Sequence, residues 1–192
     1  MLNVKVILGS TRTGRFSEKL LPWVTAELDT TDGVTHEVLD LKEWDIPFYN
    51  EPISPAVVKD GAYQNDVVRE FAVKIAEADA FLVIAPEYNH GYSAILKNAL
   101  DSVYSEWNKK VIGFVSYGSV GGGRVVEQLR AVAVELQMAP IRNAVHIQAP
   151  WNLLDESGNL NAGSLDEYDH SLTGTVEQLV WWGNALQEAR SK

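Results

Sequence analysis

The sequence contains no cysteine. This absence excludes disulfide bonds, metal sites built from thiolates and a cysteine nucleophile, and it fits a reducing compartment. Long apolar runs are missing too, because no stretch approaches the length that spans a bilayer. The strand-like N-terminus also lacks the charged-then-apolar pattern of a signal peptide. Together these absences predict a cytoplasmic protein.

Positive charge is scarce, since 16 Lys and Arg residues stand against 26 Asp and Glu residues and give a net charge of -10. This charge repels nucleic acid and anionic membranes, so we expect neither as a partner. The four histidines show no metal-ligand spacing, and we expect no metal. There is also no G-x-S-x-G elbow and no evident acid–base pair, so we expect no catalytic side chain and chemistry supplied by a cofactor.

What the chain does contain is an alternation of apolar, β-rich runs with helix-compatible stretches. The 192 residues, 46% of them apolar, predict a single domain spanning 1–192. The expected strands are the N-terminal run ending at Leu8, Val34–Leu41, Ala80–Ala85, Lys110–Tyr117 and Ile141–Ile147, and the expected helices are Ser17–Leu28, Asn65–Ala78, Ser93–Ser105, Arg124–Gln137 and Ser164–Ala189. Because residues 81–85 have no polar face, we expect an α/β/α three-layer sandwich around a five-stranded parallel sheet.

A loop rich in small and hydroxyl residues joins the first expected strand to the first expected helix. Gly9, Ser10, Thr11 and Gly14 let the backbone approach a ligand, and the free amides of the following helix turn attract phosphate. The spacing fits neither G-x-G-x-x-G nor a P-loop, which disfavours both of those folds. An ordinary surface turn with a serine N-cap is the alternative interpretation of this loop alone.

Two more small or polar turns, residues 86–93 and 116–124, follow the third and fourth expected strands. Ligands of open parallel sheets bind at the carboxyl ends of the strands, near the switch in strand order. Three such turns on one rim therefore predict one extended ligand with a phosphate at one end. Two long connections, residues 42–61 and 148–163, are expected to cover this site or to form an interface.

The motifs in these turns match a known family. They are Gly9-Ser-Thr-Arg12 with Ser17, Pro86-Glu-Tyr-Asn89 followed by Ser93 and Leu96-Lys-Asn-Ala-Leu-Asp101, Gly118-Ser-Val-Gly-Gly-Gly123, and Asp40-Leu41 with Pro47-Phe-Tyr-Asn50. Over nearly its whole length the sequence resembles the NAD(P)H-dependent FMN reductases. The resemblance implies a flavodoxin-like fold with strand order 2-1-3-4-5. It also implies bound FMN, NADPH or NADH as co-substrate, and an acceptor such as free flavin, a quinone, an azo compound or chromate.

The resemblance also implies a role for individual residues. It implies that Ser10, Arg12 and Ser17 bind the FMN phosphate, with Thr11 and Phe16 lining it. The isoalloxazine ring would lie along Pro86, Glu87, Tyr88 and Asn89, largely against backbone groups, and its pyrimidine edge would approach Ser116, Gly118, Ser119, Gly121 and Gly122. Relatives form dimers or tetramers, so a homo-oligomer is expected.

Other interpretations stay open. A flavodoxin-type electron carrier would share the fold and the flavin but would oxidise no NAD(P)H. A receiver-like signalling domain is disfavoured, because Gly9 and Pro86 stand where it needs acidic residues. His90 is either a structural group or a participant in catalysis. The tryptophans Trp181 and Trp182 are expected in the core or at a subunit contact, and Trp107 and Trp151 are compatible with subunit contacts.

Overall fold

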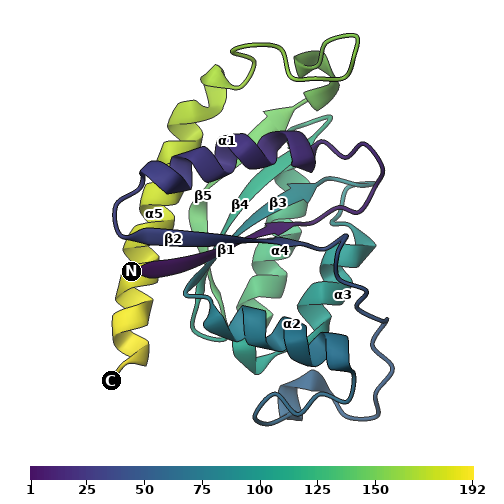
Figure 1. The fold of residues 1–192 in the computed structure, drawn as a ribbon, viewed down its shortest axis with the longest axis vertical. Helices are drawn as coiled ribbons and strands as arrows, with labels where there is room; N and C mark the ends of the chain where they lie inside the picture. The colour runs from purple at the N-terminus through teal and green to yellow at the C-terminus, as the bar shows by residue number, and fades with distance from the viewer.

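A computed structural model describes all residues from 1 to 192, and its centre is a parallel five-stranded sheet (Figure 1). The strands are β1 (Leu2–Leu8), β2 (Val34–Asp40), β3 (Ala80–Pro86), β4 (Val111–Gly118) and β5 (Ala139–Gln148). They run in the order β2-β1-β3-β4-β5, which confirms the predicted topology. The order reverses between β1 and β3, so a crevice for a ligand is expected beyond the carboxyl ends of these two strands.

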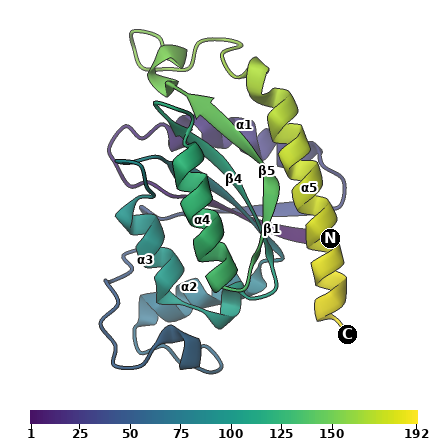
Figure 2. The same cartoon turned by 180° about the vertical axis from the view of Figure 1, so that it is seen from behind.

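Five helices cover the two faces of the sheet (Figures 1 and 2). They are α1 (Ser17–Thr30), α2 (Asp66–Glu77), α3 (Ala94–Ser102), α4 (Gly123–Glu135) and α5 (Asp166–Arg190), with short 3₁₀ turns at Pro55–Val57, Ser105–Trp107 and Pro150–Leu153. Helices α1 and α5 lie on one face, and α2, α3 and α4 on the other. The three-layer sandwich predicted from the sequence is therefore confirmed. No helix is both long and apolar enough to cross a membrane.

Each face of the sheet has its own hydrophobic core. Leu20 of α1 and Val176 of α5 belong to one core, and Phe71 of α2 and Leu129 of α4 belong to the other. All seven residues of β3 are buried, as its unbroken apolar run predicts for a central strand. Burial of apolar area on both faces is the main force that holds the sandwich together.

The predicted helix Ser93–Ser105 is too long by three residues at its C-terminal end, because α3 ends at Ser102. A 3₁₀ turn follows and places Trp107 fully inside the core, edge-on to Phe81 with ring centroids 4.7 Å apart. Trp107 is therefore a core residue of this chain. Trp181 and Trp182 are instead 65% and 40% exposed on α5, so for these two the core interpretation is wrong and a subunit contact stays a prediction.

Candidate functional site

A cavity of about 500 Å³ lies at the carboxyl edge of the sheet. The loops that follow β1, β3, β4 and β5 form its wall. Its lining residues are Arg12, Gly14, Arg15, Phe16, Lys19, Pro86, Glu87, Tyr88, Tyr117, Gly118, Ser119, Pro150, Trp151 and Leu154. Three of these four loops are the turns that the sequence predicted to meet at one ligand.

The loop from β1 to α1 places two buried hydroxyl groups beside the cavity. Ser10 and Ser17 are both fully buried, and the Ser17 Oγ has no hydrogen-bond partner within the protein. The Ser10 Oγ lies 2.7 Å from the Tyr88 hydroxyl of the loop after β3. An unpartnered buried hydroxyl is costly, so Ser17 next to the first turn of α1 is suited to an oxygen-rich ligand group.

The two arginines of this loop differ in burial and in their hydrogen bonds. The Arg15 side chain is 2% exposed, and its Nη1 donates to Asp40 Oδ1 at 2.6 Å and also to the Ser10 carbonyl. Burial works against ionisation of Asp40, but hydrogen bonds from Arg15 and the Lys42 amide outweigh it and lower the pKa of Asp40. Arg15 therefore fixes the loop, whereas the exposed Arg12 forms no ion pair and keeps its guanidinium free for a ligand.

Aromatic rings form another part of the wall. Phe16 and Tyr117 pack with ring centroids 5.4 Å apart and their planes tilted by 57°. The Tyr117 hydroxyl is buried close to Ser10 and Ser17 but forms no well-aligned hydrogen bond in the protein, and burial raises the pKa of Tyr117 to about 12. This hydroxyl stays protonated at neutral pH, so it can donate a hydrogen bond. Trp151, which is 59% exposed, stands at the mouth of the cavity.

The loop after β3 contains a tight turn with two residues in the left-handed conformation. Asn89 has φ +50° and His90 has φ +72°, while Tyr88 and Gly91 exchange backbone hydrogen bonds of 2.9 and 3.0 Å. Left-handed conformations are unfavourable for residues other than glycine and concentrate at functional sites. The turn holds Tyr88 against the cavity and directs His90 away from it, toward Arg124.

Glu87 is the one carboxylate of the cavity wall, and its side chain is 3% exposed. Its Oε1 accepts hydrogen bonds from Arg124, including one from Nε at 2.8 Å, while its Oε2 has no partner. Arg124 Nη1 also lies 2.9 Å from His90 Nε2. Because an arginine only donates, His90 Nε2 is the acceptor in this hydrogen bond. His90 thus supports the position of Arg124 and does not point into the cavity.

The turn between β4 and α4 is held from behind by Ser116. The Ser116 hydroxyl is fully buried and lies 2.8 Å from the Gly121 carbonyl and 2.8 Å from His146 Nδ1. Gly122 has φ +75°, and a Cβ there would come within 2.7 Å of the Ser116 Cβ. Only glycine fits this place, so the turn brings its backbone to the cavity edge at Gly118 and Ser119.

The sequence-predicted residues divide into those that line the cavity and those that stand behind it. Lining residues are Arg12, Phe16, Pro86, Glu87, Tyr88, Gly118 and Ser119, whereas Ser10, Thr11, Ser17, Asn89, Ser116, Gly121 and Gly122 belong to the same loops without lining it. Sequence reasoning assigned no role in the site to Tyr117, Trp151 or Leu154. A signal existed for Trp151, because it lies in one of the two long connections expected to cover a site.

A family model described as NADPH-dependent FMN reductase matches residues 2–152. The chain belongs to this family. It is 38% identical over 144 residues to an NAD(P)H-dependent FMN reductase of Schizosaccharomyces pombe, a match that covers 74% of this chain and 72% of that protein. It is 34% identical over 144 residues to an NAD(P)H:quinone oxidoreductase of Solanum tuberosum, covering 72% of this chain and 70% of that protein.

The fold has solved counterparts as well. The flavoenzyme FerB of Paracoccus denitrificans, an NAD(P)H:(acceptor) oxidoreductase, superposes with a TM-score of 0.73 at 22% identity, covering 96% of this chain and 98% of that one. As a member of the FMN reductase family, the chain is an oxidoreductase that uses FMN with NAD(P)H as co-substrate.

The cavity fits the cofactor of the FMN reductases, and we call it the flavin cavity. The unpartnered Ser17 hydroxyl and the free Arg12 guanidinium can donate hydrogen bonds to a phosphate. The Tyr117 hydroxyl and the free oxygen of Glu87 provide a donor and an acceptor for the polar atoms of a flavin. The rings of Phe16 and Tyr88 supply the apolar surface that a flat heterocycle needs.

Proposed function

We propose that the loop after β1 holds the FMN phosphate through Ser10, Arg12 and Ser17, with Thr11 and Phe16 beside it. The observation that carries this assignment is the buried Ser17 Oγ, which has no partner in the protein and lies in the first turn of α1. Arg12 rather than Arg15 supplies the charge, because Arg15 already binds Asp40 and Glu18. A charge-assisted contact of this kind is among the stronger polar interactions in proteins.

The ring of the cofactor then lies across the remaining two turns. Pro86, Glu87, Tyr88 and Asn89 form one side, and the turn that contains Ser116, Gly118, Ser119, Gly121 and Gly122 approaches the pyrimidine edge. The backbone amides of such a turn create an anion-favouring concavity. Ser116 acts from behind the turn, because its buried hydroxyl holds the Gly121 carbonyl.

When bound, FMN supplies the chemistry, since it accepts a hydride from NAD(P)H and passes electrons to a second acceptor. The chain contributes position and environment. Glu87 and Arg124 fix the loop after β3, and Tyr117 keeps its proton because burial raises the pKa to about 12. No side chain is required as a nucleophile or a general base.

For the acceptor we propose a small oxidised compound such as a quinone, free flavin, an azo compound or chromate. Relatives named as quinone oxidoreductase and as azoreductase support this range. The aromatic mouth of the cavity, with Trp151 59% exposed and Leu154 beside it, is suited to flat molecules. The rival interpretation as an electron carrier predicts no steady oxidation of NAD(P)H.

We also propose a cytoplasmic homodimer or homotetramer in which residues 1–192 form one domain. Several large apolar side chains are exposed in the loops that follow β2, β4 and β5, namely Phe48 at 78%, Val120 at 54% and Trp151 at 59%. Exposed apolar surface of this kind is typical of subunit contacts. The absence of cysteine supports a reducing compartment.

The first test follows the visible spectrum of the FMN-loaded protein under anaerobic conditions while NADPH is added. Rapid bleaching of the flavin bands, followed by steady NADPH oxidation with menadione, is expected. Bound flavin that NADPH does not bleach would favour the electron carrier. A protein that binds no FMN would overturn the site assignment.

The phosphate assignment is tested with Arg12→Ala. Loss of a charge-assisted contact is expected to weaken FMN binding by about 1.5–3 kcal/mol, or roughly 10- to 150-fold. Fluorescence titration of the apoprotein with FMN measures this change. Lys59→Ala, which removes an exposed positive charge in another loop, is the control and should leave FMN affinity within about twofold. Equal losses in both variants would mean that only net charge matters.

A further inference from the structure

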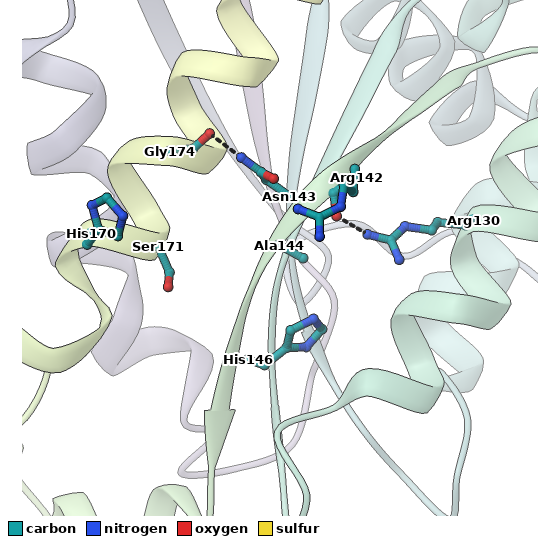
Figure 3. Close-up of a pocket in the computed structure, with 8 residues that line it drawn as sticks. All are labelled: Arg130, Arg142, Asn143, Ala144, His146, His170, Ser171 and Gly174. Carbon is teal, nitrogen blue, oxygen red and sulfur yellow. Dashed lines mark hydrogen bonds between the residues drawn. The ribbon is translucent and has the colours of Figure 1, made fainter.

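A second cavity, of about 480 Å³, lies on the outer side of the edge strand β5, between α4 and α5 (Figure 3). Arg130 reaches it from α4, Arg142 and His146 from β5, and His170 and Ser171 from α5. We call this cavity the basic groove. Of its eight lining residues, one is hydrophobic and none is a carboxylate. Its volume falls within the range of about 300–1,000 Å³ that small-molecule sites occupy.

The basic groove is unusual because the chain as a whole carries a net charge of -10. Two arginines and two histidines converge here, yet none of the four forms an ion pair with an acidic side chain. By contrast, the buried Lys5 is paired with Glu37 and Glu77, and the buried Arg15 is paired with Asp40. Positive charges gathered without counter-charges repel one another, and an anion between them relieves that repulsion.

Arg130 and Arg142 of the basic groove differ in their hydrogen bonds to the protein, but both have N–H groups without a partner. Arg130 Nη2 donates to the carbonyls of Ile141 at 3.2 Å and Arg142 at 2.6 Å, which anchors this guanidinium to the edge of β5. Its remaining N–H groups have no protein partner. The Arg142 side chain makes no hydrogen bond and is exposed. Figure 3 shows the two guanidinium groups on the same side of β5, with His146 further along the strand.

His146 connects the basic groove to the turn after β4. Its Nδ1 lies 2.8 Å from the Ser116 Oγ and 3.3 Å from the Gly121 carbonyl. The Nε2 is left without a protein partner. One imidazole therefore contacts both the basic groove and the turn after β4.

We propose that the basic groove is a second ligand site, separate from the flavin cavity, that binds a small phosphate-bearing anion. Arg130 and Arg142 supply guanidinium forks, which match phosphate oxygens, and the Ser171 hydroxyl and the His146 ring supply further hydrogen bonds. The overall charge of -10 opposes a polyanion such as nucleic acid, whereas a small anion meets only the local positive field. The lining is polar, which does not suit an apolar ligand.

The test uses the FMN-loaded protein, so that the phosphate loop after β1 is already filled and cannot report on the added anion. Pyrophosphate is titrated calorimetrically at constant ionic strength, with sodium chloride as the balancing salt. The expected result is saturable binding of one pyrophosphate per chain. Arg142→Ala should weaken it by about tenfold or more, because it removes a charge-assisted contact. The Arg142 side chain is exposed and makes no hydrogen bond or ion pair within the protein, so this variant should fold normally.

The matched control is Lys59→Ala. It removes one positive charge, as Arg142→Ala does, but from an exposed residue in the connection between β2 and α2. It should change pyrophosphate affinity less than about twofold, as expected for a distant exposed charge. A loss as large as that of Arg142→Ala would mean general attraction to positive charge and would overturn the proposal. Absence of saturable binding would overturn it as well.

A second measurement locates the ligand. The chain has only four histidines, so the imidazole resonances of a histidine-labelled sample can be followed individually. Pyrophosphate should shift the signals of His146 and His170 and leave that of His36, which lies 3.5 Å from Asp29, unchanged. Shifts confined to His36 or His90 would place the anion elsewhere. If Arg142→Ala instead dissociates the oligomer in sedimentation and no signal of the groove responds, the groove is a subunit contact and the proposal is wrong.

Discussion

The flavin cavity and the basic groove are almost equal in volume, about 500 and 480 Å³, but they are built in different ways. Loops form the flavin cavity, and its chemistry comes from backbone turns, buried hydroxyls and aromatic rings. Regular elements form the basic groove, and its chemistry comes from long charged side chains on α4, β5 and α5. A site made of backbone depends on turn geometry, whereas a site made of side chains tolerates changes in the turns.

The largest effect is expected from Gly122→Ala, which alters the turn between β4 and α4. Its φ is +75°, and the new Cβ would meet the Ser116 Cβ at 2.7 Å. Backbone strain and overpacking together should lower the free energy of unfolding by about 2–4 kcal/mol. FMN affinity should fall as well, while pyrophosphate binding to the folded protein should persist. Urea denaturation of the apoprotein and FMN titration measure the two effects.

Gly123→Ala provides the control on the same turn. A Cβ at Gly123 meets no atom within 4 Å, and its φ is not positive. Because this residue begins α4, alanine should change the free energy of unfolding by less than about 0.5 kcal/mol. Equal effects of the two substitutions would contradict the role of close packing against Ser116.

The next largest effect is expected from Arg124→Ala. This change leaves the Glu87 carboxylate, 3% exposed, without its only partner. Since Arg124 itself is 39% exposed, we expect a loss of about 2 kcal/mol in unfolding free energy, less than for a fully buried pair. Urea denaturation of the single and double variants forms a thermodynamic cycle. The double variant Glu87→Gln with Arg124→Ala should recover part of the loss, and a double variant as unstable as the sum of both changes would contradict this pairing.

The comparison also explains what the sequence could predict. Turns rich in glycine and serine after apolar runs are local patterns, so the loops after β1, β3 and β4 were predictable, whereas the strand order was predicted from the resemblance to the FMN reductases. Which arginine of the first loop is free was not, because Arg15 pairs with Asp40 and that carboxylate arrives only through the parallel pairing of Leu8 with Asp40. The basic groove has no motif at all, since α4, β5 and α5 bring its side chains together.

Ser116→Ala tests the connection between the two sites. The hydroxyl holds the Gly121 carbonyl and contacts His146 Nδ1, so its loss should weaken FMN binding by about 1 kcal/mol, or roughly fivefold. Ser102→Ala is the control, because that serine is also buried and bonds a carbonyl, that of Ala99 at 2.8 Å, but lies on α3. Both variants should lose stability in urea, and only Ser116→Ala should lose FMN affinity. Loss of affinity in both would indicate a general effect of destabilisation.

The smallest expected effect on stability is that of Ser17→Ala, and its sign distinguishes a ligand-binding group from a structural one. Ser17→Ala removes a fully buried hydroxyl that has no partner in the protein, so the apoprotein should be as stable as before or more stable, by up to about 1 kcal/mol. FMN affinity should nevertheless fall about tenfold, because the phosphate loses a hydrogen bond to a charged group. Thermal unfolding of the apoprotein and FMN titration give the two values. An apoprotein that loses stability would mean that Ser17 bonds within the protein, and the phosphate assignment of the loop would then lack its main support.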